Sequence, residues 1–361
     1  MTPKERMLTA LRRGTPDRVP ATIHQWLPYH RHHYLDGIDD LAAFRRVGLD
    51  AALSRMPLLP AESDEWVENV ENRESIAGRT VERLSITTPG GTITAVRESD
   101  EYTSWMAETF VKEKADADLI ARYMPVPRLD RETLAEEYRR LGDDGIMRGF
   151  VIGNQGGPWQ DACFWHGTER MILATFDDPG WVHHFLEVLT EKKLQYAAAN
   201  LPGADYDLIE TGGGAASSTV ISPKIFEEFC LPYDSRLHKA VHDADLPVVY
   251  HTCGGMMPIL ELIVENGCEA SETLSPPGVG GDARPAELKA RIGGRVCLIG
   301  GLDQFNVLTD GDPRQIRDEV RRLFEAYGPG GGYIMSTSDH FFHTPAANIQ
   351  AYAEAAAEMT Y

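Results

Sequence analysis

The fold of this chain is decided by the stretch Leu246-Pro247-Val248-Val249-Tyr250-His251-Thr252-Cys253-Gly254-Gly255. Its apolar run does not alternate with polar residues, which predicts a buried strand of a parallel sheet. Residues i and i+2 of a strand point to the same side, so His251 and Cys253 are expected to share one site. Imidazole and thiolate both bind zinc, whereas a buried histidine beside a buried free cysteine is the structural alternative.

Composition limits the classes of protein to consider. The 361 residues are 42% hydrophobic, enough for a full core, and the net charge of -20 argues against nucleic acid or an anionic membrane as partner. No run of about 18 apolar residues and no apolar signal region occurs, so we expect no membrane span. An odd number of widely spaced cysteines without a C-x-x-C predicts a reducing, cytoplasmic location; they are Cys163, Cys230, Cys253, Cys268 and Cys297.

Apolar strand patterns recur along the chain and alternate mostly with helical patterns. They fall near residues 21, 50, 147, 206, 247, 271, 296 and 333. This alternation predicts an α/β fold, a (β/α)8 TIM barrel in a single domain over residues 1–361. The rival, a doubly wound sheet, would carry G-x-G-x-x-G after the first strand, predicted from Ala21 to Gln25, and none occurs there. Residues 66–111 interrupt the rhythm, and Pro89-Gly90-Gly91 between two alternating runs predicts an antiparallel β-hairpin insertion.

Polar residues gather where the predicted strands end. The carboxyl ends of barrel strands carry the chemistry of this fold. One barrel mouth with imidazoles, a thiol and carboxylates suits a zinc site, and it equally suits acid–base catalysis without metal. The residues at these ends are His24, Gln25, Asn154, Gln155, Glu210, His251, Cys253, Glu272, Asp303, Asp339 and His340.

Several motifs together resemble the uroporphyrinogen decarboxylase superfamily over nearly the whole chain. They are Glu5-Arg6 with Pro16-Asp17-Arg18-Val19-Pro20, Ser222-Pro223 with Phe226, Phe229 and Pro232, His251-Thr252-Cys253-Gly254, Gly300-Gly301-Leu302-Asp303, and Ser338-Asp339-His340 with Thr344-Pro345 and Asn348-Ile349. The resemblance implies a (β/α)8 barrel, in agreement with the strand count.

The superfamily has two chemistries. The porphyrinogen decarboxylases carry an R-Q-A-G-R segment and a strand-end aspartate. In this chain, residues 24–29 stand where the R-Q-A-G-R segment would be and do not match it. The predicted second strand ends Leu53-Ser54-Arg55-Met56 and has no aspartate. A heme-pathway decarboxylase is therefore not expected. The zinc-dependent methyltransferases, which move a methyl group from a corrinoid protein to a thiol such as coenzyme M, use a His-x-Cys pair and a late Cys. His251 and Cys253 match the pair, and the late position falls at Ser338.

The resemblance to the methyltransferase branch implies zinc bound by His251 and Cys253, with Asp339 completing the ligand set in preference to Glu210 or His340. It also implies a small-molecule substrate, a corrinoid on a carrier protein as partner, and a homodimer. We predict catalytic roles for Glu210, Asp303 and His340. The residues predicted to bind substrate are His24, Gln25, Trp26, Asn154, Gln155 and Glu272.

The alternative is a metal-free decarboxylase or lyase acting on a carboxylated substrate, either porphyrinogen-like or small. Decarboxylation needs a cation to hold the carboxylate and an acid to protonate the carbanion. Arg55, Arg148 and His24 are the candidates for the first role, and Asp303 or His340 for the second.

Overall fold

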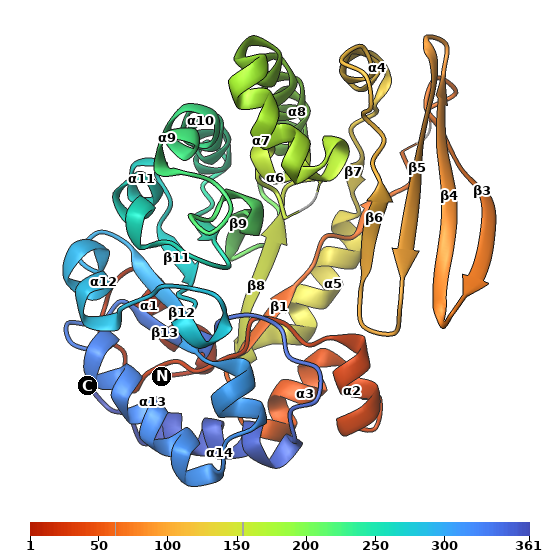
Figure 1. The fold of residues 1–361 in the computed structure, drawn as a ribbon. Coiled ribbons are helices and arrows are strands. Elements are labelled where there is room, and N and C mark those ends of the chain that lie inside the picture. The colour runs from red at the N-terminus through yellow and green to blue at the C-terminus, as the bar shows by residue number, and fades with distance from the viewer. Residues whose placement is uncertain (62, 154) are drawn as a thin grey trace.

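The computed structural model describes residues 1–61, 63–153 and 155–361, and in them seven parallel strands form one curled sheet (Figure 1). Helices lie along the outer side of this sheet, so the predicted α/β, TIM-barrel-like fold is confirmed. In spatial order the strands are β1 (Ala51–Ser54), β8 (Gly145–Phe150), β9 (Leu208–Gly212), β10 (Val248–His251), β11 (Ala270–Thr273), β12 (Cys297–Leu302) and β13 (Tyr333–Thr337).

The segment around Ala21 occupies the eighth position without forming a strand. Ala21 makes one isolated parallel bridge with Met335, and its carbonyl accepts from Asp50 N at 2.8 Å. Pro20 has no N–H, and Ala21 N donates to the Asp50 side chain, so the ladder does not extend. The predicted strand from Ala21 to Gln25 is therefore wrong, although the segment still connects β13 to the start of β1.

The connections between the strands are helical. A π-helical turn spans Phe226–Cys230, and another spans Gln304–Thr309. No helix in residues 1–61, 63–153 and 155–361 is long and apolar enough to span a membrane. The helices are α1 (Pro3–Leu11), α2 (Pro28–Tyr34), α3 (Asp40–Val47), α4 (Asp116–Tyr123), α5 (Arg131–Leu141), α6 (Pro158–His166), α7 (Thr168–Asp177), α8 (Pro179–Asn200), α9 (Pro223–Ile225), α10 (Leu231–His242), α11 (Leu260–Glu265), α12 (Pro285–Ile292), α13 (Pro313–Tyr327) and α14 (Ala346–Ala357).

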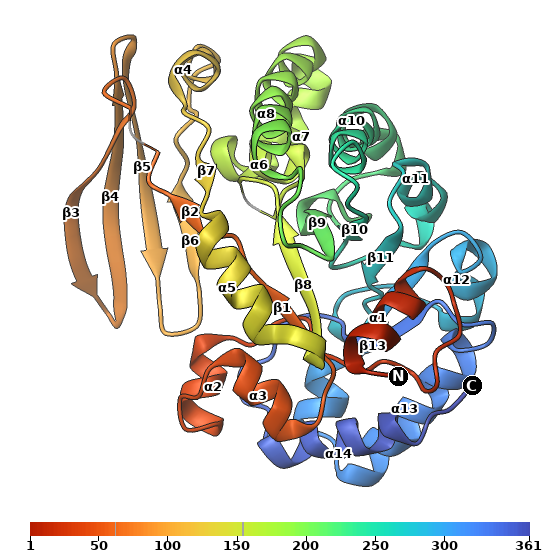
Figure 2. The same ribbon diagram turned by 180° about the vertical axis from the view of Figure 1, so that it is seen from behind.

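The predicted insertion is an antiparallel sheet beside the barrel (Figure 2). Its strands pair in the order β3 (Val67–Ile76), β4 (Arg79–Thr88), β5 (Gly91–Ser99) and β6 (Ser104–Glu108). Thr88 pairs with Gly91, so Pro89 and Gly90 form the turn, as the sequence predicts. A short pair, β2 (Leu58–Leu59) with β7 (Arg128–Leu129), connects the insertion to the barrel.

The inside of the barrel is apolar toward the amino ends of its strands. Inward-facing residues of the strands pack there against Met7, Ala10 and Leu11 of α1. A capping box at Thr2 and Glu5 begins this helix. The strand residues in this apolar layer are Ala52, Ile146, Leu208, Val249, Ala270, Cys297, Ile299 and Ile334.

Candidate functional site

Two residues beyond the apolar layer, the inward positions of four neighbouring strands become charged or polar. Side chains of a strand alternate between its two faces, so a residue two positions along faces the same way. β10 pairs with β9 on one side and β11 on the other, and in this register His251 is opposite Glu272. In each of the four strands, an apolar residue is followed two positions later by an ionisable one: Ile146 by Arg148, Leu208 by Glu210, Val249 by His251 and Ala270 by Glu272.

Arg148 joins the two glutamates of this charged layer. Its Nη2 donates to Glu210 Oε2 and to Glu272 Oε1, each at 2.7 Å, and all three side chains are at most 3% exposed. Burial alone would lower the pKa of Arg148, but the two carboxylates outweigh it and raise that pKa. Burial raises the pKa of Glu210, whereas Arg148 and His251 overcome burial at Glu272 and lower its pKa. Glu272 is therefore the firmly ionised member of the pair.

His251 connects this ion pair to the barrel mouth. Its Nδ1 lies 3.0 Å from Glu272 Oε1 and 3.6 Å from Glu210 Oε1. Burial would lower the pKa of His251, but Cys253 and Glu272 outweigh it and raise the pKa well above the usual value. Nε2 is buried and has no hydrogen-bond partner in the described chain. A carboxylate that accepts from one ring nitrogen leaves the other for a ligand, the arrangement common at metal-binding histidines.

Three side chains meet at the outer side of His251. A ring nitrogen of His251, Cys253 Sγ and an Asp339 carboxylate oxygen all lie within 4.8 Å of one another. This donor set of nitrogen, sulfur and oxygen fits zinc, and it leaves room for a further ligand. A Cβ on residue 214 would lie 2.5 Å from Cys253 Sγ, so Gly214 provides the space that the thiol occupies.

A second group, His24, Glu210, His251 and Glu272, is equally close but is a poorer metal site. Arg148 already places a positive charge between its two carboxylates. A divalent cation in the same place would meet that charge at short range. The outer group of His251, Cys253 and Asp339 therefore fits a metal better than this second group; His24, Asp339 and His340 form a third close group.

His24 and His340 complete the cluster. The His24 ring centroid lies 4.9 Å from those of His251 and His340, and burial lowers the pKa of His24 to about 3, so its imidazole is neutral. His340 Nδ1 lies 2.6 Å from Asp339 Oδ1, and its Nε2 lies 3.3 Å from Gln25 Oε1. Burial raises the pKa of Asp339, but its hydrogen bond with His340 outweighs this and holds the pKa below the usual range.

A cavity of about 300 Å³ opens beside these groups. It adjoins both Cys253 and Asp339, so a small molecule in it would reach the outer group. The residues that line it are Cys253, Gly254, Ser275, Val279, Gln304, Phe305, Asp339, His340 and Phe342.

Other predicted site residues have structural roles. Trp26 is 4% exposed and packs among His30, Phe44 and Phe341, so its predicted place in a substrate pocket is corrected to the core. Asp303 Oδ1 accepts from the backbone N–H groups of Phe305 and Asn306, which makes it the N-cap of the π-helical turn.

The remaining predicted residues lie around the cluster or beyond it. Glu210 and Glu272 belong to the buried ion pair and are not cavity residues, whereas His340 is. Gln155 lies in the loop before α6 with a φ of 53°, and it does not line this cavity. Asn154 lies outside the described residues.

Ser338, at the position where the methyltransferase branch has its late cysteine, is not directed to the metal-ligand group. Its hydroxyl donates to Gln304 Oε1 at 2.8 Å, the hydroxyl oxygen also lies 3.0 Å from Leu302 O, and the residue is fully buried. The next residue, Asp339, is the one that reaches His251 and Cys253.

Sequence reasoning considered Arg148 only as a group that holds a substrate carboxylate and missed its part in organising the site. The available signal was a lone cation in the otherwise uncharged strand Gly145–Phe150. A buried charge in such a strand requires a partner, and the inward glutamates of the neighbouring strands are the natural candidates.

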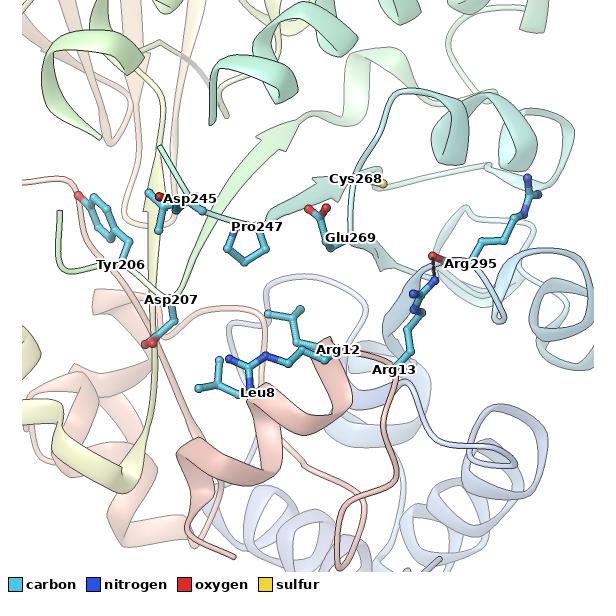
Figure 3. A pocket seen from close by; sticks show the side chains of 12 residues that line it. Leu8, Arg12, Arg13, Tyr206, Asp207, Asp245, Pro247, Cys268, Glu269 and Arg295 are labelled. Atoms are coloured by element: carbon cyan, nitrogen blue, oxygen red, sulfur yellow. Dashed lines mark hydrogen bonds between the residues drawn. The ribbon is translucent and has the colours of Figure 1, made fainter. Parts of the chain in front are cut away.

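A larger cavity, of about 680 Å³, lies at the opposite end of the strands (Figure 3). Its carboxylates hold structure: Asp207 accepts from Met147 N at 2.8 Å, and Glu269 accepts from Val248 N at 2.8 Å. Arg13 donates to Arg295 O at 2.7 Å. These hydrogen bonds stabilise the amino ends of the strands. In barrels of this fold, that end usually contributes to stability.

Comparisons with known proteins agree with the barrel fold. Residues 107–359 match the family described as Uroporphyrinogen decarboxylase (URO-D). The chain is 30% identical over 198 residues to the uroporphyrinogen decarboxylase of Hydrogenovibrio crunogenus, a match that covers 52% of each chain. It is 31% identical over 216 residues to that of Ralstonia pickettii, covering 56% of this chain and 54% of that protein. The chain thus spans about half the length of the curated relatives it matches.

Among solved structures, a methyltransferase from Methanosarcina mazei has a similar fold. The TM-score is 0.67, and the alignment covers 99% of each chain at 18% identity. At this identity the likeness concerns the fold.

Proposed function

The chain belongs to the uroporphyrinogen decarboxylase family, and on that premise we propose that it is a zinc-dependent methyltransferase that moves a methyl group from a corrinoid, held on a carrier protein, or from another donor to a thiol. The observation that carries the proposal is the outer group of the cluster. His251 Nε2 is buried and unpartnered in the described chain, and His251 lies with Cys253 and Asp339 within a single metal-sized space.

His251, Cys253 and Asp339 would hold the zinc. The metal supplies a positive charge that keeps an acceptor thiol ionised at neutral pH. Arg148 and Glu272 keep the His251 ring in one orientation, because Glu272 accepts from its Nδ1. His340 lines the cavity and donates from Nδ1 to Asp339, and its Nε2 could take the proton that the thiol loses once it leaves Gln25 Oε1.

The transfer itself is a displacement at the methyl carbon. A sulfur lone pair forms the new S–C bond while the bond from carbon to the donor breaks, and that bonding pair stays on the donor. With a methylcorrinoid as donor, cobalt(III) becomes cobalt(I). The cavity walls Val279, Phe305 and Phe342 are apolar and exclude water from the thiolate, which strengthens it as a nucleophile.

Metal analysis of protein purified without added zinc tests the proposal directly. We expect about one zinc per chain, and less than about a tenth of a zinc with activity intact would exclude the mechanism. His251→Ala and Cys253→Ala should each lose the metal and lower methyl transfer from methylcobalamin to 2-mercaptoethanol by at least about 100-fold. Cys268→Ala is the matched control, since Cys268 is a buried cysteine that lines the opposite cavity and should leave both unchanged.

The names of the curated relatives favour a second candidate, a metal-free decarboxylase acting on a carboxylated substrate. A decarboxylase needs a cation that binds the substrate carboxylate. Arg148 already pairs with two glutamates, and Arg55 with Asp40 and Glu137, so either arginine would first have to leave its partners. Incubation of the protein with candidate acids and a strong chelator separates the candidates. Carbon dioxide release that the chelator leaves unchanged would support the decarboxylase.

A further inference from the structure

We propose that the acceptor thiol of this site is small and carries no negative charge, so that the site discriminates against anionic thiols. The inference rests on the proposed function and names its substrate class. Four features of the cavity beside Cys253 and Asp339 carry it: its lining, the nearest arginines, the backbone amides around it and its balance of charge.

The lining offers an anion no fixed positive charge. Among the described residues that line the cavity, none is a lysine or an arginine. Three of its nine lining residues, Val279, Phe305 and Phe342, are large and apolar, and the one carboxylate among the nine is Asp339. Sites for carboxylate, phosphate or sulfonate groups ordinarily present arginine or lysine.

The arginines near the strand ends are committed elsewhere. Arg148 is 3% exposed and donates to Glu210 and Glu272. Arg55 donates to both oxygens of Asp40 and to Glu137. Freeing either guanidinium for a ligand would leave buried or half-buried carboxylates without a partner, which is costly.

The backbone amides at two helix starts are already capped by carboxylates. Helix starts at the carboxyl end of a barrel commonly bind phosphate through free N–H groups. Here Asp303 Oδ1 accepts from Phe305 N and Asn306 N at 3.0 and 2.8 Å. Asp282 Oδ1 accepts from Met256 N and Met257 N at 2.7 and 3.1 Å. These carboxylates replace an external anion and would repel one.

The outer group also has no positive charge left over that could bind an anionic acceptor. A thiolate at Cys253 and a carboxylate at Asp339 together balance a divalent cation. The imidazole of His340 is engaged by Asp339 at Nδ1 and by Gln25 at Nε2. A negatively charged tail on the acceptor would therefore lie beside Asp339 without a counter-charge.

One neutral polar group remains for the far end of the thiol. Gln304 lines the cavity, and its Oε1 accepts from Ser338, which leaves its amide NH2 to donate. A hydroxyl or carbonyl oxygen suits that donor. The volume of about 300 Å³ is at the lower end for ligand pockets, so the acceptor is a small molecule.

Three thiols of equal length and different charge test the inference: 2-mercaptoethanol, cysteamine and 2-mercaptoethanesulfonate. Each is titrated into the cobalt(II)-loaded protein, and binding is followed by the thiolate-to-cobalt absorption band. We expect the sulfonate to bind at least about tenfold more weakly than the other two, because like charges placed together are strongly disfavoured. Rates of methyl transfer from methylcobalamin should follow the same order.

A charge added to the cavity rim provides the second arm. Phe305 lines the cavity and is 41% exposed, so Phe305→Arg should fold. The added positive charge should reduce the difference in affinity between the sulfonate and the other two thiols by about tenfold. Phe176→Arg is the matched control, because Phe176 is 73% exposed on α7 and lies outside the lining, and it should leave the order unchanged.

The outcomes are distinguishable. Equal or tighter binding of the sulfonate by the wild-type protein would overturn the inference and leave the methyltransferase proposal standing. A cobalt spectrum that responds to none of the three thiols would overturn the methyltransferase proposal, and the inference with it. The wild-type series decides the question even if Phe305→Arg does not fold.

Discussion

The inside of the barrel consists of two layers that differ in character although the same strands build both. At the amino end, Ile146, Leu208, Val249 and Ala270 pack against α1 and contain no charge. Two residues further, the same strands present Arg148, Glu210, His251 and Glu272. Both layers are buried, so burial does not distinguish them.

The difference lies in the kind of polar atom that is left without a partner: at the amino-end cavity it is the Tyr206 hydroxyl, and in the charged layer it includes a histidine ring nitrogen. Around the amino-end cavity, the carboxylates of Asp207 and Glu269 accept backbone hydrogen bonds and so hold the strands in place (Figure 3). In the charged layer, Arg148 Nε and His251 Nε2 have no partner in the described residues, and of the two only the imidazole nitrogen can bind a metal. A buried polar atom without a partner is costly, so its presence marks the place where a ligand is expected.

Removing the cation of the charged layer should have the largest effect. Arg148→Met leaves Glu210 and Glu272 buried without a counter-charge, and we expect a loss of about 3–5 kcal/mol in the free energy of unfolding. Urea denaturation measures it. Arg236→Met removes a cation from a pair of exposed salt bridges to Glu187 and Glu191 and should cost no more than about 1 kcal/mol. Similar losses in the two variants would contradict the distinction.

Truncating a side chain in the apolar layer should destabilise the protein without affecting the metal site. Leu208→Ala removes a side chain that is 1% exposed, and we expect a loss of about 2–4 kcal/mol. Zinc content per folded chain should stay unchanged, because Leu208 lies one layer below the ligands. Leu59→Ala, at a leucine 42% exposed, is the control for stability. Loss of metal from Leu208→Ala would show that the layers are coupled.

Neutralising Glu272 should weaken the metal site more than the fold. In Glu272→Gln an amide oxygen can still accept from His251 Nδ1, but the negative charge behind the ring is lost. We expect zinc affinity, measured by competition with a chromophoric chelator, to fall about 10–100-fold. Glu261→Gln, which changes a surface partner of Arg291, should leave the affinity as it is. An unchanged affinity in Glu272→Gln would remove the orienting role of the carboxylate.

The smallest effect concerns His238, a buried histidine whose ring nitrogens both have partners. Nδ1 lies 2.9 Å from Asn266 O, and Nε2 lies 2.7 Å from Thr211 Oγ1. Burial lowers its pKa from 6.5 to about 3, so its contribution to stability is complete above pH 6.5 and is lost as the pH falls toward 3. The stability advantage of the wild type over His238→Gln should shrink by about 1.4 kcal/mol between about pH 7.5 and 5.5.

Denaturant titrations at the two pH values check this prediction. A gap that stays constant for His238→Gln would mean that its imidazole is protonated in the folded protein at the lower pH.

Much of the fold and part of the site could be predicted from the sequence. Apolar runs separated by helical patterns predict the barrel, Pro89-Gly90-Gly91 predicts the hairpin, and the i, i+2 spacing predicts that His251 and Cys253 face one space. These features depend on local backbone periodicity, which a few neighbouring residues determine. The strand at Ala21 failed because its backbone N–H groups go to Asp50 and β13 in a pattern that local composition does not reveal.

By itself, then, the sequence predicted which strand ends carry polar residues and that His251 and Cys253 face the same way. Only the tertiary structure decided which of them touch: that Arg148 joins two glutamates, that Glu272 holds His251, that Asp339 reaches the thiol where Ser338 does not, and that Asp303 caps a turn. The reason is physical. Periodicity along one strand sets the direction of a side chain, whereas contact depends on the register and curvature that bring several strands together, and those depend on the packing of the whole barrel.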